Sequence, residues 1–237
     1  MYTFKSRVRY SEINSERELT LPSLLDYLQD CCTFQSEALG VGLDYLAEKQ
    51  LGWVLLSWEI EIVRYPKMGE EISVHTWPYN FKGFYGYRNF LVESDRGGTI
   101  ARANSIWAFM DMGRMRPTRI TDAMLQAYDF DEPLTGEWGD RKIEPPANGQ
   151  KKEHVQVARS HIDTNHHMNN GKYVLVAEEY LPEDFLVGRL RVEYRKAARV
   201  GDILCPEVTV EQDAVTVVLA EESGSVWAVV QFLRRQQ

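Results

Sequence analysis

The densest group of polar side chains in this sequence directly precedes an apolar stretch in its second half. Within it, Asp163, Asn165 and His167 alternate along the chain. In an extended segment, residues two apart share a face, so these side chains are predicted to converge as one carboxylate, one amide and one imidazole. Imidazole gains and loses a proton near neutral pH, which makes His167 the candidate general base. Either of the other two could then fix its tautomer and orientation.

A helix is predicted to begin directly after these residues, at Asn169, Asn170 and Gly171. The first N–H groups of a helix lack partners within it, and the helix dipole is positive at that end. These N–H groups could therefore stabilise negative charge on a carbonyl oxygen. Hydrolysis at a carbonyl carbon needs such donors and a base that deprotonates water, and the segment supplies both.

Two other interpretations of the same segment stay open. Asn and Asp before a helix commonly only cap it, with nearby histidines solvated, and spacing alone favours this interpretation. A metal site would need a recognised ligand spacing such as HExxH, and none is present. Its ligands would be His161, Asp163, His166 and His167.

Bulk properties exclude several classes of protein. The chain has 237 residues, 44% of them hydrophobic, which is enough for one large core or two smaller ones. A net charge of −8 argues against a nonspecific nucleic-acid binder. No run of about 18 apolar residues predicts a membrane-spanning helix. The N-terminus does not resemble a signal peptide, and three cysteines form no convincing disulfide framework, so we expect a cytoplasmic protein.

An antiparallel sheet and one long helix are predicted for the first half. Thr20 and Pro22 open an apolar pattern of helical spacing over residues 21–40, and Gly40 supplies a stop. A strand is predicted before this helix, over residues 2–10. Downstream, β-branched and aromatic runs predict further strands over residues 53–65, 70–79, 84–94 and 99–112.

The chain then becomes acidic and rich in proline, which is typical of a linker. We therefore predict an N-terminal domain over residues 1–130, a linker over 131–152 and a C-terminal domain over 153–237. The C-terminal domain repeats the N-terminal domain in outline, with a helix over residues 169–185. Its strands are predicted over residues 154–162, 188–197, 202–212, 214–222 and 225–235.

The two halves can be aligned as an internal repeat. The segment 68–70 resembles 200–202 at an offset of 132, whereas Glu12 and Asn14 resemble Asp163 and Asn165 at an offset of 151. The difference between these offsets predicts that the first unit carries 19 extra residues. The extra length is assigned to its helical region.

The segment from Asp163 to Tyr173 closely resembles the signature of acyl-acyl carrier protein thioesterases, Asp-x-Asn-x-His-x-Asn-Asn-x-x-Tyr. Several further matches to the family occur in order through the rest of the chain. A series of ordered matches is more specific than a single match. They are Arg64-Tyr65-Pro66 with Gly69-Glu70, then Thr76-Trp77, then residues 103–107, then residues 114–119.

This resemblance implies an α+β fold, a tandem hot-dog repeat in which each half wraps an antiparallel sheet around a long central helix. It implies an acyl-chain cavity in the first half and a catalytic second half, with Asp163, Asn165 and His167 at the catalytic positions. The implied reaction releases a free fatty acid from the phosphopantetheine thiol of acyl carrier protein, which ends fatty acid synthesis. No metal or organic cofactor is implied. Glu12 and Asn14 would be a degenerate copy that lacks the histidine.

One departure from the family pattern concerns the position after the strand VEYRK. Plant members carry a Glu-Cys pair there, whereas this chain has Ala197 and Ala198. A covalent cysteine route through that position is excluded, so direct attack by water is favoured. Another carboxylate, such as Glu193, could replace the missing glutamate.

The partner and the function leave alternatives open. Arg114, Arg116 and Arg119 form a basic cluster that could steer an acidic carrier protein. The alternative, that these residues are only a solvated loop face, is equally supported. The nearest rival function is an acyl-CoA thioesterase, and a second is a noncatalytic acyl-binding regulatory protein, which the two alanines favour. Neither a nucleic acid nor a membrane is expected as a partner. The sequence does not decide between a monomer and a homodimer.

Overall fold

The computed structural model describes residues 1–236, which divide into two units that are both built on antiparallel strands. The first unit contains residues 1–56 and 63–138, and the second contains residues 57–62 together with the chain from Gly139 onward. Strand β2 (Leu51–Ile62) therefore contributes its first half to one unit and its second half to the other.

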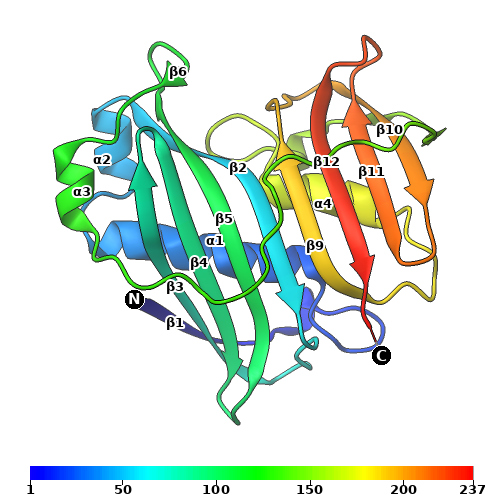
Figure 1. Cartoon of the computed structure of the whole chain (residues 1–237), viewed down its shortest axis with the longest axis horizontal. Helices are drawn as coiled ribbons and strands as arrows, with labels where there is room; N and C mark the ends of the chain where they lie inside the picture. Colours follow the sequence, from blue (N-terminus) through cyan, green and yellow to red (C-terminus); the bar gives the residue numbers. More distant parts are fainter. Residues whose placement is uncertain (237) are drawn as a thin grey trace. The chain divides into compact units, whose positions relative to one another are not determined.

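In the first unit, the sheet has the strand order β1-β3-β4-β5-β2, and helix α1 packs against β1 and β3 (Figure 1). On β3, Ile72, Val74 and Thr76 lie two residues apart on one face and are fully buried. Two shorter helices, a short strand and a 3-10 turn complete the unit. The bounds are β1 (Tyr2–Arg7), η1 (Tyr10–Glu12), α1 (Leu21–Ala38), α2 (Leu43–Glu48), β3 (Glu71–Lys82), β4 (Tyr85–Ser94), β5 (Thr99–Asp111), β6 (Arg116–Pro117) and α3 (Asp122–Ala127).

Helix α1 forms where the apolar pattern predicts it. The Thr20 hydroxyl accepts a hydrogen bond from the Ser23 N–H at 3.3 Å, and Pro22 occupies the first turn. Leu24 and Leu28 are buried on the face that meets the sheet. Gly40, with a φ of +71°, follows the helix in the left-handed conformation that glycine adopts without strain.

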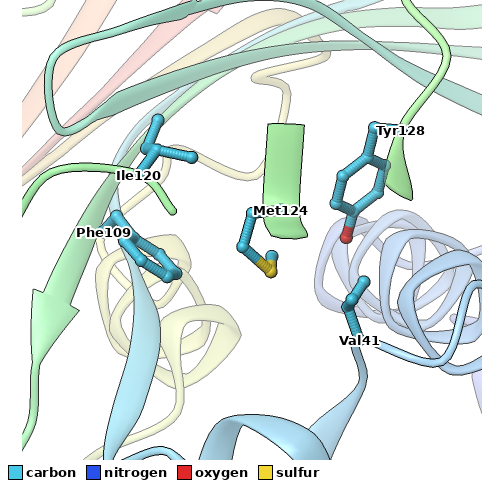
Figure 2. Close-up of a cluster of buried hydrophobic side chains, with 5 residues drawn as sticks. All are labelled: Val41, Phe109, Ile120, Met124 and Tyr128. Carbon is cyan, nitrogen blue, oxygen red and sulfur yellow. The ribbon is translucent and has the colours of Figure 1, made fainter. Parts of the chain in front are cut away.

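Helices α2 and α3 were not predicted, and α3 closes a small separate core. Met124 of α3 is fully buried at the centre of this cluster (Figure 2). The N-cap hydroxyl of Thr121 accepts from the Met124 N–H, which fixes the start of the helix. The other buried members are Val41, Phe109, Ile120 and Tyr128.

The second unit repeats the plan on a smaller scale. Its sheet has the order β2-β9-β12-β11-β10-β7, and helix α4 packs against β12 and β11. The core lies between this helix and the buried faces of β9, β11 and β12, where Leu190, Val217 and Phe232 are fully buried. The bounds are β7 (Gln150–Lys151), β8 (Val155–Gln156), η2 (Arg159–His161), α4 (Asn170–Glu178), β9 (Val187–Tyr194), β10 (Ile203–Val210), β11 (Ala214–Ala220) and β12 (Val226–Arg234).

Two predicted elements of the second unit are shorter than expected. The helix predicted over residues 169–185 ends at Glu178, because the chain turns before Pro182, which cannot continue a helix. The strand predicted over residues 154–162 is reduced to β8. Residues 159–161 beyond it form a 3-10 turn and therefore do not pair with a strand.

The predicted linker has little secondary structure but is held by specific hydrogen bonds. In the first unit, the Trp77 indole N–H donates to the Glu132 carbonyl oxygen at 2.9 Å, and the Leu134 N–H donates to the Asn89 side chain at 2.9 Å. In the second unit, the Gly139 N–H donates to the Glu59 carboxylate at 2.8 Å. No helix among residues 1–236 is long and apolar enough to cross a membrane.

Candidate active site

The residues predicted to carry the chemistry lie in a tight loop, and the expectation of an extended segment is wrong. Ile162 and Met168 pair across the base of the loop, and the Asp163 N–H donates to the His167 carbonyl oxygen at 2.9 Å. The Asp163 carboxylate accepts from the Asn165 N–H at 2.8 Å, which makes a side-chain turn. His166 has a φ of +59°, and this left-handed residue reverses the chain.

The loop places Asp163 and His167 opposite each other at its base and Asn165 in the turn. The first two side chains are half-buried, and Asn165 is exposed. Within residues 1–236, the side chains of Asn165 and His167 make no hydrogen bond or ion pair. The imidazole is therefore not oriented by either predicted partner, and it is left available to a substrate or water.

The start of α4 is capped as the structural interpretation of the motif predicts. Asn169 is the N-cap, and its side-chain oxygen accepts from the Gly171 N–H at 2.8 Å. The Asn169 N–H donates to the His161 carbonyl oxygen at 2.8 Å. The prediction of three unpaired N–H groups is therefore wrong for Asn169 and Gly171, and only the N–H of Asn170 remains a candidate oxyanion donor.

Tyr173 and Ala198 tie the helix to the loop that follows β9. The Met168 N–H donates to the Ala198 carbonyl oxygen at 2.8 Å, and the Ala198 N–H donates to the Tyr173 hydroxyl at 2.8 Å. Burial, assisted by the negative charges of Asp202 and Asp163, raises the pKa of Tyr173 to about 12. Ala198 is thus in direct contact with the motif.

Glu193 does not replace the missing glutamate. Neighbouring residues of a strand point to opposite faces, and the hydroxyl of the adjacent Tyr194 reaches the Asn170 carbonyl oxygen at the start of α4. Glu193 therefore lies on the other face, where it accepts from the Ile143 N–H at 3.0 Å and from Arg195 at 2.8 Å. Its carboxylate anchors the linker.

The first unit contains the same loop with different side chains. Ile13 pairs with Leu19 across its base, and the Asn14 N–H donates to the Glu18 carbonyl oxygen at 2.9 Å. Arg17 has a φ of +62° and occupies the place of His166. The Asn14 side chain accepts from the N–H groups of Glu16 and Glu18, both at 3.0 Å.

These hydrogen bonds correct the predicted alignment of the repeat. Asn14 corresponds to Asp163 at an offset of 149, so the predicted offset of 151 is wrong. Glu12 corresponds to His161, because each side chain accepts from the N–H three residues earlier. The offset of 132 is confirmed: the Val8 N–H bonds to Glu70, as the Val157 N–H bonds to Asp202. The difference between 149 and 132 gives 17 extra residues in the first unit.

The remaining candidate residues lie elsewhere. Arg114, Arg116 and Arg119 are exposed around β6 in the first unit, and the Arg114 guanidinium lies 3.8 Å from the Asp111 carboxylate. Burial raises the pKa of the Cys31 thiol to about 12, so this thiol stays protonated and is a poor nucleophile. No group of three or more His, Cys, Asp or Glu side chains within residues 1–236 could hold a metal ion.

Two successive units, each with an antiparallel sheet packed on a helix that follows the same tight loop, define a tandem hot-dog protein. The family model of the acyl-ACP thioesterase N-terminal domain matches residues 1–128, and that of the C-terminal domain matches residues 144–228. The chain therefore belongs to the acyl-ACP thioesterase family, which confirms the resemblance found in the sequence.

Individual relatives agree with this assignment. The chain is 26% identical over 235 residues to an acyl-acyl carrier protein hydrolase of Cuphea viscosissima, over 92% of this chain and 54% of that protein. It thus spans about half the length of the first curated relatives it matches. An acyl-ACP thioesterase structure from Bacteroides thetaiotaomicron has a TM-score of 0.90 at 24% identity, covering 98% of this chain and 97% of the other. The 12:0-ACP thioesterase of Umbellularia californica has a TM-score of 0.86 at 18% identity, covering 100% and 97%, and both likenesses confirm the fold.

Proposed function

We propose that this chain hydrolyses fatty-acyl thioesters of acyl carrier protein and so terminates fatty acid synthesis. Water adds to the thioester carbonyl carbon, the carbon–sulfur bond breaks, and the products are a free fatty acid and the carrier thiol. The observation that carries the proposal is the Asp163–His167 loop in a member of this family. This loop presents an imidazole that makes no hydrogen bond or ion pair within residues 1–236.

In the proposed mechanism, His167 removes a proton from the attacking water and returns one to the departing sulfur. The negative charge of Asp163 stabilises the imidazolium that forms between these two steps. Asn165 and the N–H of Asn170 are the candidate donors to the carbonyl oxygen, where negative charge develops. The route needs no cysteine and is compatible with Ala197 and Ala198.

The basic residues around β6 are proposed to receive the carrier protein. Arg114, Arg116 and Arg119 are exposed cations in a chain of net charge −8, and an acidic partner would be attracted to them selectively. If they dock the carrier, kcat/KM for acyl carrier protein esters falls with added salt, whereas kcat does not.

The test measures release of free thiol from acyl carrier protein and coenzyme A esters of several chain lengths. His167→Ala is expected to lower kcat about 100-fold or more, because a general base is lost. Asp163→Asn is the matched variant: the first unit builds this loop with Asn14, so asparagine preserves the fold and removes only the charge. Its kcat is expected to fall by a similar order.

Each outcome has a definite meaning. If the coenzyme A esters are turned over faster than the acyl carrier protein esters, coenzyme A replaces acyl carrier protein as the proposed carrier, and the proposed reaction is unchanged. Absence of turnover with every ester would refute the proposed hydrolase and favour an acyl-binding protein, which the alanines at 197 and 198 would suit. Equal rates for wild type and His167→Ala would remove His167 from the mechanism.

A further inference from the structure

Arg88 of β4 is a cation buried in the core of the first unit. It is 8% exposed, and it pairs across the sheet with Ser105 of β5, which is fully buried. One amino group of its guanidinium donates to the Thr76 hydroxyl at 3.0 Å and to the side-chain oxygen of Gln35 on α1. The guanidinium carbon lies 5.4 Å from the centre of the Tyr128 ring. The positive charge is therefore held between the sheet and the helix.

This guanidinium has no counter-ion. Gln35, Thr76 and Tyr128 are neutral, and no carboxylate forms an ion pair with Arg88 within residues 1–236. A charge held away from water is costly unless an opposite charge lies beside it. The bonds to Gln35 and Thr76 use the same amino group, so the other amino group and Nε keep N–H donors that these two acceptors do not occupy. The site therefore fits an anionic ligand.

The second unit shows that folding does not require a polar site at this place. The offset of 132 carries β3 onto β10, and the strand registers then carry β4 onto β11 and β5 onto β12. At three positions where the first unit has polar side chains, the second unit has buried apolar ones. The corresponding pairs are Thr76 and Val208, Arg88 and Val215, and Ser105 and Phe232. A departure from an adequate apolar core is expected where function imposes a further requirement.

The other members of the site come from elements that the second unit does not share. At the offset of 149, α4 corresponds to residues 21–29 of α1, so Gln35 lies in a part of that helix with no counterpart. Tyr128 directly follows α3, which has no equivalent among the described residues of the second unit. The Tyr128 hydroxyl lies 2.7 Å from the Ser36 hydroxyl, and its ring belongs to the apolar cluster around Met124 (Figure 2). An uncompensated cation therefore lies beside an apolar cluster.

We propose that Arg88 binds the carboxylate of a long aliphatic chain whose apolar part packs on the cluster around Met124. The planar fork of a guanidinium matches a carboxylate with two parallel hydrogen bonds, and the carboxylate supplies the missing counter-ion. The apolar cluster offers the chain a surface away from water.

Such a carboxylate has two sources. One is the free fatty acid that the hydrolysis releases, and the other is an acyl substrate with a second carboxylate at its far end. We favour the free fatty acid because the proposed function produces it, and this choice rests on that function. The released acid then competes with the acyl chain that the first unit is expected to hold, so the product inhibits its own formation.

The binding test compares dodecanoate with dodecanol, which has the same chain and no charge, by calorimetry on the full chain at about pH 8. Wild type is expected to bind dodecanoate about 10- to 100-fold more tightly, because a hydrogen bond to a charged group is worth more than a neutral one. In Arg88→Met this ratio should fall to about 1. The control is Arg96→Met, which removes an exposed cation from the turn between β4 and β5 and should keep the wild-type ratio.

Gln35→Glu gives a second variant if Arg88→Met does not fold. It places a carboxylate where the amide oxygen already accepts from Arg88, so the cation gains a counter-ion within the protein. Its affinity for dodecanoate is expected to fall about 10-fold or more. A Gln35→Glu protein that binds dodecanoate as tightly as wild type would overturn the site, and so would equal wild-type affinities for dodecanoate and dodecanol.

Kinetics separate the two sources of the carboxylate. If the ligand is the product, added dodecanoate raises the KM of wild type for a dodecanoyl thioester, and this effect is lost in Arg88→Met. If the ligand is a substrate, wild type has a higher kcat/KM for the thioester with a carboxylate at its far end, and Arg88→Met does not. An inactive wild type that still binds dodecanoate more tightly than dodecanol would refute the proposed hydrolysis and support the site, so the two failures are distinguishable.

Discussion

Glu178, the last residue of α4, is expected to make the stability of the protein depend on pH. Its half-buried carboxyl group makes no hydrogen bond or ion pair within residues 1–236. Burial, followed by the charge of Glu179, raises its pKa to about 7 from the usual value of 4.5. The negative end of the helix dipole also disfavours an anion there.

The magnitude follows from the difference between these values. Each pKa unit corresponds to about 1.4 kcal/mol, so keeping Glu178 ionised costs the folded state about 2–3 kcal/mol once partial exposure is allowed for. The unfolded chain releases this proton near pH 4.5, and the folded chain near pH 7. The free energy of unfolding is therefore highest below pH 4.5 with respect to this group, and it falls as the pH rises to about 7.

Glu178→Gln tests this directly, because glutamine stays neutral. Equilibrium urea unfolding should show the variant more stable than wild type by about 2–3 kcal/mol at pH 8 and equally stable at pH 4. The exposed neighbour provides the control, since Glu179→Gln removes a charge of minor influence and should gain only a small part of that amount. A stability difference between Glu178→Gln and wild type that is the same at both pH values would refute the reasoning.

Two further predictions concern the first unit. Hydrogen bonds from the Arg64 guanidinium hold the pKa of Glu70 at about 2, so the stability from this pair is full above pH 4.5 and is lost as the pH falls toward 2. In acid unfolding titrations, Glu70→Gln should not show the loss of stability between pH 4.5 and pH 2. An acid unfolding curve that matches wild type would contradict this prediction. Phe90 is fully buried on β4, so Phe90→Ala should lower the free energy of unfolding by about 3–5 kcal/mol. A urea midpoint unchanged from wild type would show that the site does not pack as described.

The strands of the second unit were predicted within a few residues because their pattern is local. β11 was expected over residues 214–222 and is Ala214–Ala220, and β12 was expected over 225–235 and is Val226–Arg234. Both are β-branched or aromatic runs between charged and glycine-containing turns. Such runs have high strand propensity wherever a sheet is present to receive them.

Helices α2 and α3 could not be predicted in the same way. Each has six residues, which is less than two turns and too short for an apolar period to repeat. Their stability comes from tertiary packing, as the burial of Met124 in the cluster of Figure 2 shows for α3. The Thr121 cap was a signal in the sequence that could have located the start of that helix.

The geometry of the loop from Asp163 to His167 was missed because the alternation of polar residues was taken as a strand pattern. Asp163 and Asn165 are two apart because the aspartate accepts from the N–H two residues on, which is a turn signal. The positive φ of His166 is also invisible in a sequence without glycine at that place. The offset of the repeat failed for a related reason, because the backbone is conserved between the units and the side chains are not.

The two copies of this loop separate what the fold requires from what it does not. The first unit shows that asparagine at the aspartate position is sufficient to close the turn. It also places Glu18 beside Lys67, with an ion pair of 2.9 Å that steadies the loop.

At the equivalent positions the second unit has His167 and Arg199, which cannot form that ion pair. The capping and turn interpretation is therefore correct for Asn169 and for the turn that the Asp163 side chain closes. It does not explain why the second unit has a charged carboxylate at 163 and an unpaired imidazole at 167, since the first unit builds the same loop with a neutral asparagine and an ion-paired glutamate. Residues that depart from a structurally adequate solution are expected where function imposes a second requirement. On this argument, the charge of Asp163 and the unpaired ring of His167 are the two features of the loop that folding does not explain, and they are the two features that the proposed hydrolysis would use.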